Sequence, residues 1–166
     1  MDVLATLCDA LVFILPSYVA NGTPVVMTKI VKRGKPLDLG LNFIDGRRVF
    51  GDGKTVEGFI SGLLMGTLVG MLLSRLGLKE SFLLSLGAML GDLVGSFIKR
   101  RIGLERGAPL PPLDQLDFIA GSLLLYSWFV KVVPLNIVMI VLGLTPPLHL
   151  LTNFIAYKLG LKSVPW

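Results

Sequence analysis

Hydrophobic positions in this chain form long runs that polar residues rarely interrupt. A helix needs roughly 20 mostly apolar residues to cross a bilayer, and about five segments approach or exceed that length. We therefore predict an all-α fold, a polytopic membrane helix bundle of about five transmembrane helices, in which residues 1–166 form a single domain. The expected spans are residues 3–31, 56–76, 81–98, 114–131 and 132–157.

Prolines lie inside the first and last of these spans. Pro16 and the group from Asn21 to Pro24 interrupt the first span, and Pro146 and Pro147 interrupt the last. Backbone groups that proline leaves without a hydrogen bond must find partners in protein or water when they lie in a membrane. We therefore expect a kinked or broken first helix and a bent last helix.

The composition is typical of a membrane protein. Of the 166 residues, 53% are hydrophobic and 16% are charged, whereas about a quarter of the residues in a soluble domain are charged. The net charge of +5 resides mainly between the spans, where basic residues set topology and contact anionic headgroups or phosphates. The lipid bilayer is thus an expected partner, and nucleic acid is not. The lone cysteine, Cys8, excludes an intramolecular disulfide.

The distribution of basic residues predicts the orientation of the bundle. Segments 32–54 and 99–113 and the C-terminus carry most of the lysines and arginines, while Arg75, Lys79 and Lys131 lie on the other side. Because segments rich in lysine and arginine stay in the cytoplasm, we expect a multi-pass protein of the cell membrane with two cytoplasmic loops. The N-terminus would face outside, and the polar chemistry would lie on the cytoplasmic side.

Glycines recur at every fourth position in the second and third spans. Such a stripe has no side chains, so it lets two helix backbones approach closely. We expect each stripe to face the other or a neighbouring helix, within one chain or between the subunits of a homo-oligomer. Asp92 directly follows Gly91, so the stripe turns that acid toward the bundle interior. The two stripes are Gly58, Gly62, Gly66 and Gly70, and Gly87, Gly91 and Gly95.

Three aspartates are predicted to lie near the cytoplasmic ends of two spans. Asp92 precedes Lys99 by two helical turns, about 10 Å at roughly 1.5 Å per residue, and Asp114 and Asp117 share one face of the fourth helix. Because a charge in hydrocarbon is costly without partners, such acids are functional candidates. Mg²⁺ prefers carboxylates, water and phosphate oxygens as ligands. We therefore predict that Asp92, Asp114 and Asp117 bind Mg²⁺.

Structural roles are the alternatives for these polar residues. Asp92 could form an ion pair with Lys99 or an arginine, and the two acids of the fourth helix could cap that helix. No cluster of cysteine and histidine is present that would favour zinc. The single histidine, His149, is expected to pack in the bundle.

The segment NFIDGRRVFGDGKTVEG, residues 42–58, combines glycines with basic and hydroxyl side chains. Glycines let backbone N–H groups approach phosphate oxygens, arginine binds them with two donors, and lysine adds a point charge. The segment is not a P-loop, because Arg48 stands where GxxxxGKS/T requires glycine. We predict phosphate binding here, with a topogenic loop as the alternative. The candidate residues are Asn42, Asp45, Gly46, Arg47, Arg48, Lys54 and Thr55.

A hydroxyl and an ammonium group, Ser96 and Lys99, lie near the Asp92 face of the third helix and suit a phosphate at the membrane surface. With their neighbours they resemble the membrane cytidylyltransferases that make CDP-activated phospholipids. The signature of that family is S-x-x-K-R, then a basic residue, then D-R-x-D, and it matches residues 96–100, Arg106 and residues 114–117. The blocks K-T-x-E-G and G-D-x-x-x-S match residues 54–58 and 91–96.

Two departures from the signature indicate one branch of that family. Residues 109–112 replace the G-H-G-G of the family, and Gln115 replaces the arginine of D-R-x-D. With the short chain, these features are most similar to the archaeal branch, whose lipid substrate is an unsaturated diether phosphate. The resemblance extends over residues 42–120.

The resemblance implies a Mg²⁺-dependent reaction of CTP with 2,3-bis-O-geranylgeranyl-sn-glycerol 1-phosphate. A cytidylyl group would pass to the lipid phosphate, and pyrophosphate would leave. The lipid phosphate is already ionised at neutral pH, so no general base is needed. The implied catalytic residues are Lys54, Ser96 and Lys99, with Arg100 and Arg106 as further phosphate ligands and Arg47 and Arg48 on the β- and γ-phosphates.

Two other functions are consistent with the same residues. A CTP-dependent kinase of a polyprenol would transfer the γ-phosphate and release CDP. A small ion channel or transporter would use Asp92 to line its pathway, but the charge gathers on one side and no internal repeat is evident, although many transporters have one.

Overall fold

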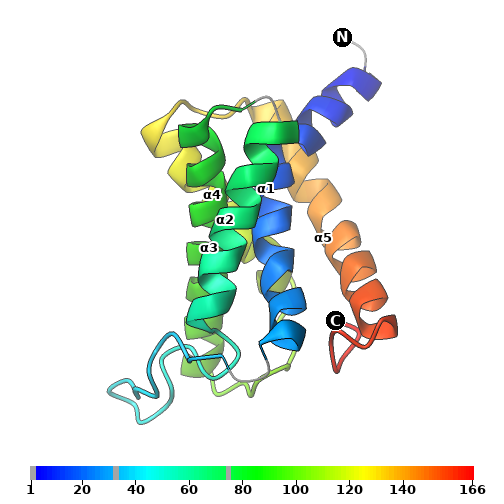
Figure 1. The fold of residues 1–166 in the computed structure, drawn as a ribbon. Coiled ribbons are helices and arrows are strands. Elements are labelled where there is room, and N and C mark those ends of the chain that lie inside the picture. Colours follow the sequence, from blue (N-terminus) through cyan, green and yellow to red (C-terminus); the bar gives the residue numbers. More distant parts are fainter. Residues whose placement is uncertain (1–2, 32–33, 74–75) are drawn as a thin grey trace.

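The structure is a computed structural model that describes residues 3–31, 34–73 and 76–166 (Figure 1). Within these ranges the chain forms five helices and no β-sheet. They are α1 (Val3–Ile30), α2 (Val56–Leu73), α3 (Leu78–Arg101), α4 (Leu113–Phe129) and α5 (Leu135–Lys158). The predicted all-α helix bundle is confirmed.

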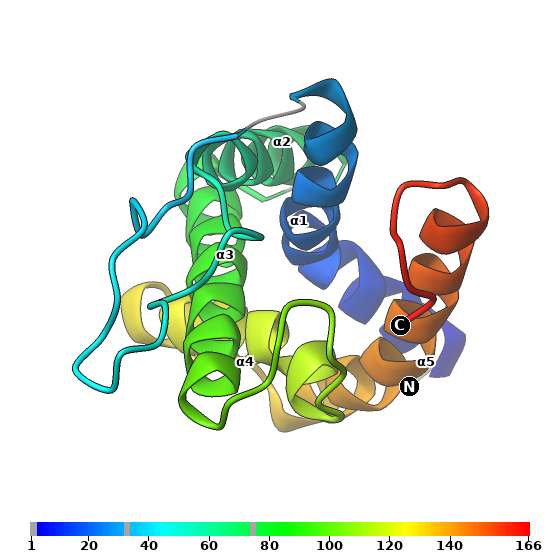
Figure 2. The ribbon, with the colours of Figure 1, turned by 90° about the horizontal axis from the view of Figure 1, so that it is seen from below.

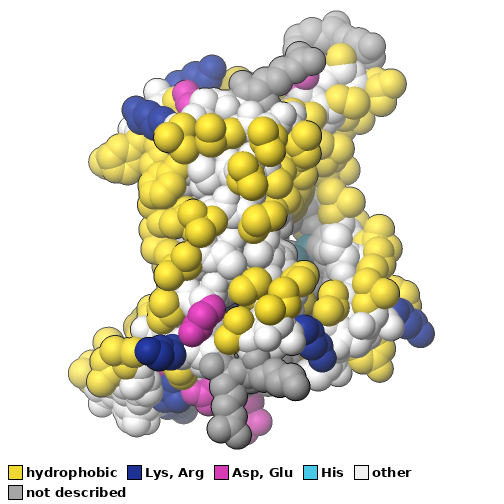
Figure 3. Space-filling model, viewed as in Figure 1, with side chains coloured by type: hydrophobic (Ala, Val, Ile, Leu, Met, Phe, Trp, Pro, Cys, Tyr) yellow, Lys and Arg dark blue, Asp and Glu magenta, His cyan; other side chains and the backbone are white. Residues whose placement is uncertain are grey.

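Four of the described helices, α1, α2, α3 and α5, are long and apolar enough to cross a membrane. With 17 residues, α4 is shorter than the roughly 20 residues of a full crossing, and it makes its most extensive contact with α3. Hydrophobic side chains cover the sides of the molecule, and charged side chains gather toward its two ends (Figure 3).

Neither proline-containing helix is broken, so of the two alternatives for the first helix, kinked or broken, the broken one is wrong. The helix α1 continues through Pro16 and Pro24, although its N-terminal part tilts away from the bundle (Figure 1). Hydroxyl groups directly before two of the prolines help to keep adjacent turns bonded. Thr23 donates to the carbonyl of Val19 (2.7 Å), and Thr145 donates to the carbonyl of Val141 (2.6 Å). Such side-chain bonds let a membrane helix tolerate proline.

The glycine stripes face neighbouring helices and not each other. A Cβ atom on Gly62 of α2 would lie 2.6 Å from the carbonyl oxygen of Ala20 in α1 and 2.7 Å from the sulfur of Met89 in α3. A Cβ atom on Gly91 of α3 would lie 2.2 Å from the carbonyl oxygen of Asp117 in α4. The α3 stripe therefore brings the backbone of α4, and with it Asp117, directly against α3.

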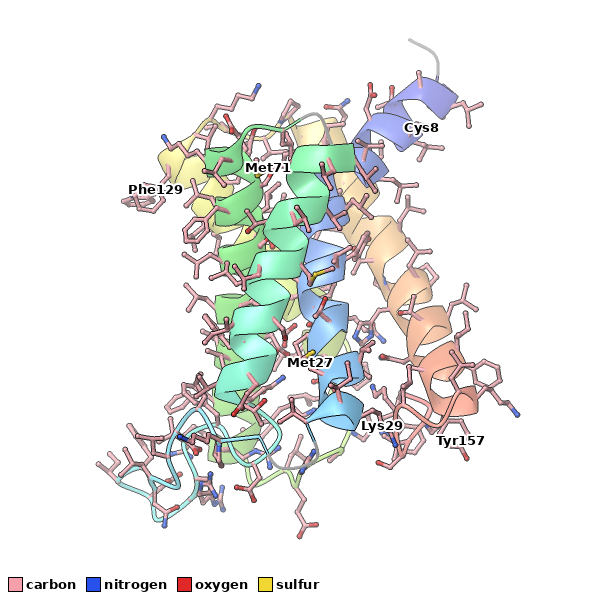
Figure 4. All side chains as sticks on the ribbon, viewed as in Figure 1. Cys8, Met27, Lys29, Met71, Phe129 and Tyr157 are labelled. Carbon is pink, nitrogen blue, oxygen red and sulfur yellow. The ribbon has the colours of Figure 1, made fainter. Side chains whose placement is uncertain are left out.

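All the long connections gather at one end of the bundle, which we call the loop end. It holds the 34–55 segment, the 102–112 segment and the C-terminal tail of residues 159–166 (Figures 1 and 2). Lys29 and Tyr157 lie at this end, whereas Cys8, Met71 and Phe129 lie at the other (Figure 4). The basic segments that the sequence placed on one side of the membrane are thus together at one end.

Candidate functional site

A cavity of about 900 Å³ opens at the loop end between α1, α3, α4 and α5. Its apolar walls come from residues such as Phe59, Met89 and Phe118, and its polar groups come mainly from α3, α4 and the residues before α2. It therefore combines apolar walls with a set of charged and hydroxyl side chains. The predicted site residues that line it are Lys54, Thr55, Asp92, Ser96, Lys99, Arg100, Arg106, Asp114 and Asp117.

Helix geometry places the acids of α3 and α4 in this cavity. Asp92, Ser96 and Lys99 follow one another at helical spacing along α3. At the start of α4, Asp114 accepts a hydrogen bond from the backbone N–H of Leu110 (2.8 Å), and Asp117 accepts one from the N–H of Phe118 (2.6 Å). These bonds fix both carboxylates on the first turns of α4.

A glycine of α3 makes room for Asp117. A Cβ atom on Gly95 would lie 2.0 Å from the carboxylate oxygen Oδ2 of Asp117, which is closer than any two such atoms can approach. The glycine stripe thus serves the site as well as the packing, because it lets a carboxylate of α4 rest on the surface of α3.

Two lysine–aspartate ion pairs span the cavity. Lys54 Nζ lies 2.5 Å from Oδ2 of Asp92, and Lys99 Nζ lies 2.9 Å and 3.0 Å from the two carboxylate oxygens of Asp114. The four side chains are only 14–28% exposed, so solvent screens these pairs less than it screens surface pairs. Asp92 is therefore paired, as the structural alternative held, but with Lys54 and not with Lys99 or an arginine.

The predicted metal ligands, Asp92, Asp114 and Asp117, line one cavity but do not form a compact metal-binding cluster. In the described parts of the chain, no three side chains of His, Cys, Asp or Glu lie close enough together to hold a metal ion. Two of the three acids, Asp92 and Asp114, form ion pairs with lysines, whereas Asp117 forms no ion pair with a described residue. The set of hard oxygen donors nevertheless has the chemistry that Mg²⁺ requires.

Arg47 and Arg48 lie beside this cavity and do not line it. Arg47 donates to the main-chain carbonyls of Arg101 (2.6 Å) and Arg100 (3.4 Å), where it satisfies groups at the C-terminus of α3. Arg48 forms ion pairs with Asp38 (2.5 Å) and Asp52 (2.6 Å). Both arginines line a smaller adjoining cavity of about 360 Å³, which shares Gly51, Asp52, Arg100 and Arg106 with the main one.

Three further candidates from the 42–58 segment also lie outside the main cavity. Asp45 forms an ion pair with Arg101 (2.8 Å), whose guanidinium lies 4.8 Å from the ring centroids of Phe43 and Phe97. Gly46 adopts a φ of 76°, in the left-handed region that favours glycine, and closes the turn. Asn42 forms a backbone bridge with Arg48. These residues attach the loop to α3.

Asp38 is a buried residue of the loop that the sequence interpretation missed. Only 5% exposed, it accepts hydrogen bonds from Arg48 and from the backbone N–H groups of Phe50 (3.0 Å), Gly51 (2.9 Å) and Gly40 (3.2 Å). Burial by itself would raise the pKa of Asp38, but these hydrogen bonds outweigh it and hold the pKa below its ordinary value. The spacing of Asp38 and Gly40 is typical of an Asx turn. This sequence feature could have indicated that Asp38 binds the backbone of its own loop.

Through these bonds Asp38 supports one wall of the cavity. Its carboxylate holds Gly51, and the N–H of the preceding Leu37 donates to the carbonyl of Lys54 (2.7 Å). The stretch 51–54 between these two attachments lines the cavity. Because the folded pKa is depressed, this stabilisation is complete above the unfolded pKa of about 4 and is lost as the pH falls toward the folded value.

We expect Asp38→Ala to release the loop from the bundle. Removal of one partner leaves Arg48 and three loop N–H groups without their acceptor, which for a buried pair costs about 3–5 kcal/mol. Limited trypsin digestion should then cleave after Arg47 and Arg48 at least several-fold faster than in the unmodified protein. Glu105→Ala, which removes an exposed acid from the other loop, is the matched control. Equal cleavage rates in Asp38→Ala and the unmodified protein would contradict the anchoring role.

Similarity to known proteins extends over nearly the whole chain. The family model described as CarS-like, CDP-archaeol synthase, matches residues 3–79 and 75–166. The CDP-archaeol synthase of Thermofilum pendens is 50% identical over 163 residues, which cover 95% of this chain and 80% of that protein. The CDP-archaeol synthase of Methanopyrus kandleri is 50% identical over 167 residues, which cover 93% and 90%.

A solved structure has the same fold. Described as "Structural insight into an intramembrane enzyme for archaeal membrane lipids biosynthesis", it is 40% identical, with a TM-score of 0.77 over 87% of this chain and 92% of its own. The similarity therefore includes both the sequence and the arrangement of the helices, and it confirms the resemblance found in the signature residues. The chain belongs to the CDP-archaeol synthase family.

Proposed function

We propose that the cavity at the loop end is the active site of a CTP-dependent cytidylyltransferase. There a cytidylyl group passes from CTP to 2,3-bis-O-geranylgeranyl-sn-glycerol 1-phosphate, which gives CDP-archaeol and pyrophosphate. The observation that supports this assignment best is the pair of lysine–aspartate contacts, Lys54–Asp92 and Lys99–Asp114, facing one cavity at the end of a membrane bundle. Membership of the family favours this reaction over the kinase and channel alternatives.

The size and position of the cavity suit two substrates of different polarity. Its volume of about 900 Å³ lies near the upper end of ligand pockets, which range from about 300 to 1,000 Å³. That is room for a nucleoside triphosphate together with a phosphate headgroup. We propose that the loop end faces the cytoplasm and the N-terminus faces outside, since basic segments stay in the cytoplasm. CTP would then arrive from water, and the lipid from the bilayer.

Phosphoryl chemistry needs alignment and charge neutralisation more than covalent participation by the protein. We assign Lys54 and Thr55 to the phosphates of CTP, and Ser96 and Lys99 to the lipid phosphate. An oxygen of the lipid phosphate attacks the α-phosphorus of CTP, a new P–O bond forms, and the bond to the β-phosphate oxygen breaks so that pyrophosphate leaves. The attacking oxygen is already ionised, so the chain has no proton to remove.

The remaining arginines complete the electrostatic environment. Arg100 and Arg106 line the main cavity and also the smaller one, and there they can bind the phosphates that become pyrophosphate. Arg47 and Arg48 are engaged with the loop and the end of α3, and we assign them the support of that loop.

We propose that Asp92, Asp114 and Asp117 hold Mg²⁺ during the reaction. When bound, the ion neutralises charge on the α-phosphate and on the leaving pyrophosphate. The donor set fits, because Asp117 has no cation partner among the described residues and the other two acids are paired only with flexible lysines. With Asp92 and Asp114 as ligands of the ion, the ammonium groups of Lys54 and Lys99 would be free to bind phosphate oxygens.

Position-specific labelling of CTP tests the reaction. The purified protein is incubated with the diether lipid phosphate and with CTP labelled either at the α- or at the γ-phosphorus. Cytidylyl transfer puts the α-label into the lipid and the γ-label into pyrophosphate. A polyprenol kinase would instead put the γ-label into an alcohol acceptor and release CDP. Parallel reactions with a diester lipid phosphate measure the preference for the ether lipid.

A further inference from the structure

The C-terminal tail, residues 159–166, folds back from the end of α5 at the loop end (Figures 1 and 2). The indole Nε1 of Trp166 donates to the carbonyl oxygen of Gly107 (2.9 Å), which joins the tail to the segment between α3 and α4. Lys162, Ser163, Val164 and Trp166 all line the cavity. The tail is therefore a wall of the site.

Lys162 brings a further cation into the cavity. Its ammonium group donates to the main-chain oxygen of Trp166 (2.5 Å) and forms no ion pair with an acidic side chain of the described residues. Lys54 and Lys99, by contrast, each face an aspartate. Burial of a charged group is unfavourable unless the group finds a partner of opposite charge. A half-buried lysine that faces a cavity without such a side chain is thus suited to an anion that enters the cavity.

The electrostatic environment of Lys162 links it to both ion pairs. Burial lowers the pKa of its ammonium group, and the charges of Asp114, Lys54, Lys99 and Asp92 act on it as well. All four belong to the two lysine–aspartate pairs, so the Lys162 ammonium lies within electrostatic reach of the groups that we assign to the substrates. None of the motifs in the sequence includes Lys162.

We infer that Lys162 is a further substrate-binding residue, which binds a phosphate group from the tail side of the cavity while Lys54 or Lys99 binds from the helix side. This inference rests on the proposed function, because that function supplies the phosphates. The phosphate belongs either to CTP or to the lipid substrate. In both cases a phosphate oxygen replaces the main-chain oxygen of Trp166 as the acceptor of the Lys162 ammonium group.

Steady-state kinetics of Lys162→Met and Lys162→Arg test the inference. One charge-assisted hydrogen bond corresponds to a change in binding of at least about tenfold, so Lys162→Met should raise one KM by at least about tenfold. The other KM and kcat should stay within about threefold, and Lys162→Arg should restore most of the affinity. A raised KM for CTP assigns the residue to the nucleotide, and a raised KM for the lipid phosphate assigns it to the lipid.

Lys158→Met is the matched control, since Lys158 is an exposed lysine of the last turn of α5 that lies outside the cavity.

A second variant tests the same inference without touching the lysine. Trp166→Phe keeps the aromatic ring but removes the donor to Gly107, so it should raise the same KM by a smaller factor. The inference is overturned if Lys162→Met keeps both KM values within twofold of the unmodified protein, or if it lowers kcat alone. Failure of the unmodified protein to move the α-label of CTP into lipid would instead overturn the proposed function.

Discussion

Replacing Asp92 or Asp117 by asparagine is expected to lower turnover of CTP by about a thousandfold or more, because a lost electrostatic contact to the reacting phosphates costs about 10²–10³ in rate even where it is a single donor. Asparagine has the shape of aspartate but lacks the negative charge that a divalent cation requires. Turnover is measured with CTP labelled at the α-phosphorus, at saturating Mg²⁺ and lipid phosphate.

Both variants should remain folded, because asparagine keeps the structural hydrogen bonds of each acid. In Asp92→Asn the amide oxygen can still accept from Lys54, and in Asp117→Asn it can still accept from the N–H of Phe118, as the carboxylates do. Melting temperature and elution volume in detergent check this point. Asp9→Asn is the control, since Asp9 is an exposed acid of α1 next to Cys8, which lies at the end opposite the loop end (Figure 4). Unchanged turnover in Asp92→Asn or Asp117→Asn would refute the metal assignment.

Helix periodicity is enough to predict that Asp92, Asp114 and Asp117 face one cavity. Spacing along a helix determines both depth and face, so Asp92 could be placed two turns below the boundary of the bundle, and Asp114 and Asp117 on one face. The glycine stripe added that Asp92 turns toward the bundle interior. These two features depend on local geometry, whereas the packing of α4 against Gly91 and Gly95 is a tertiary contact that the spacing left open.

The path of the loops and the tail could not be predicted in this way. Asp38 and Lys162 reach the site only because their segments fold back over distant parts of the chain, and no short-range pattern encodes that return. The same limit applies to Arg47. The composition of the 42–58 segment suggested that this arginine binds phosphate, but its side chain donates hydrogen bonds to carbonyls at the end of α3.

Some helix ends also differ from the prediction for a physical reason. The last helix begins at Leu135 and not at residue 132, because the residue before a proline is driven toward extended backbone and Pro134 stands at the cap. In α3 the helix begins at Leu78, so that Lys79 and Glu80 belong to its first turn. Hydrophobicity alone had placed these charged residues outside the span, although charged side chains are readily solvated at a membrane boundary.

The two lysines of the ion pairs should separate the two substrates kinetically. Lys54→Met is expected to raise the KM for CTP, and Lys99→Met the KM for the lipid phosphate. Each substitution removes a charge-assisted hydrogen bond of about 1.5–3 kcal/mol, which corresponds to about a 10- to 150-fold loss of affinity. Initial rates are measured by varying one substrate while the other is saturating.

The location of the two lysines is the reason to expect this separation. Lys54 precedes α2 beside the glycine-rich 51–53 stretch, whereas Lys99 lies on α3 one turn from Ser96 and pairs with the first turn of α4. Lys131→Met removes a lysine near the opposite end of the bundle and should change neither KM.

The arginine variants of Lys54 and Lys99 keep the charge that neutralises each aspartate, so they distinguish loss of substrate binding from loss of the ion pair. If both methionine variants raised the KM of the same substrate, the lysine–aspartate pairs would form one subsite, and the lipid phosphate would have to be bound by other groups of the cavity.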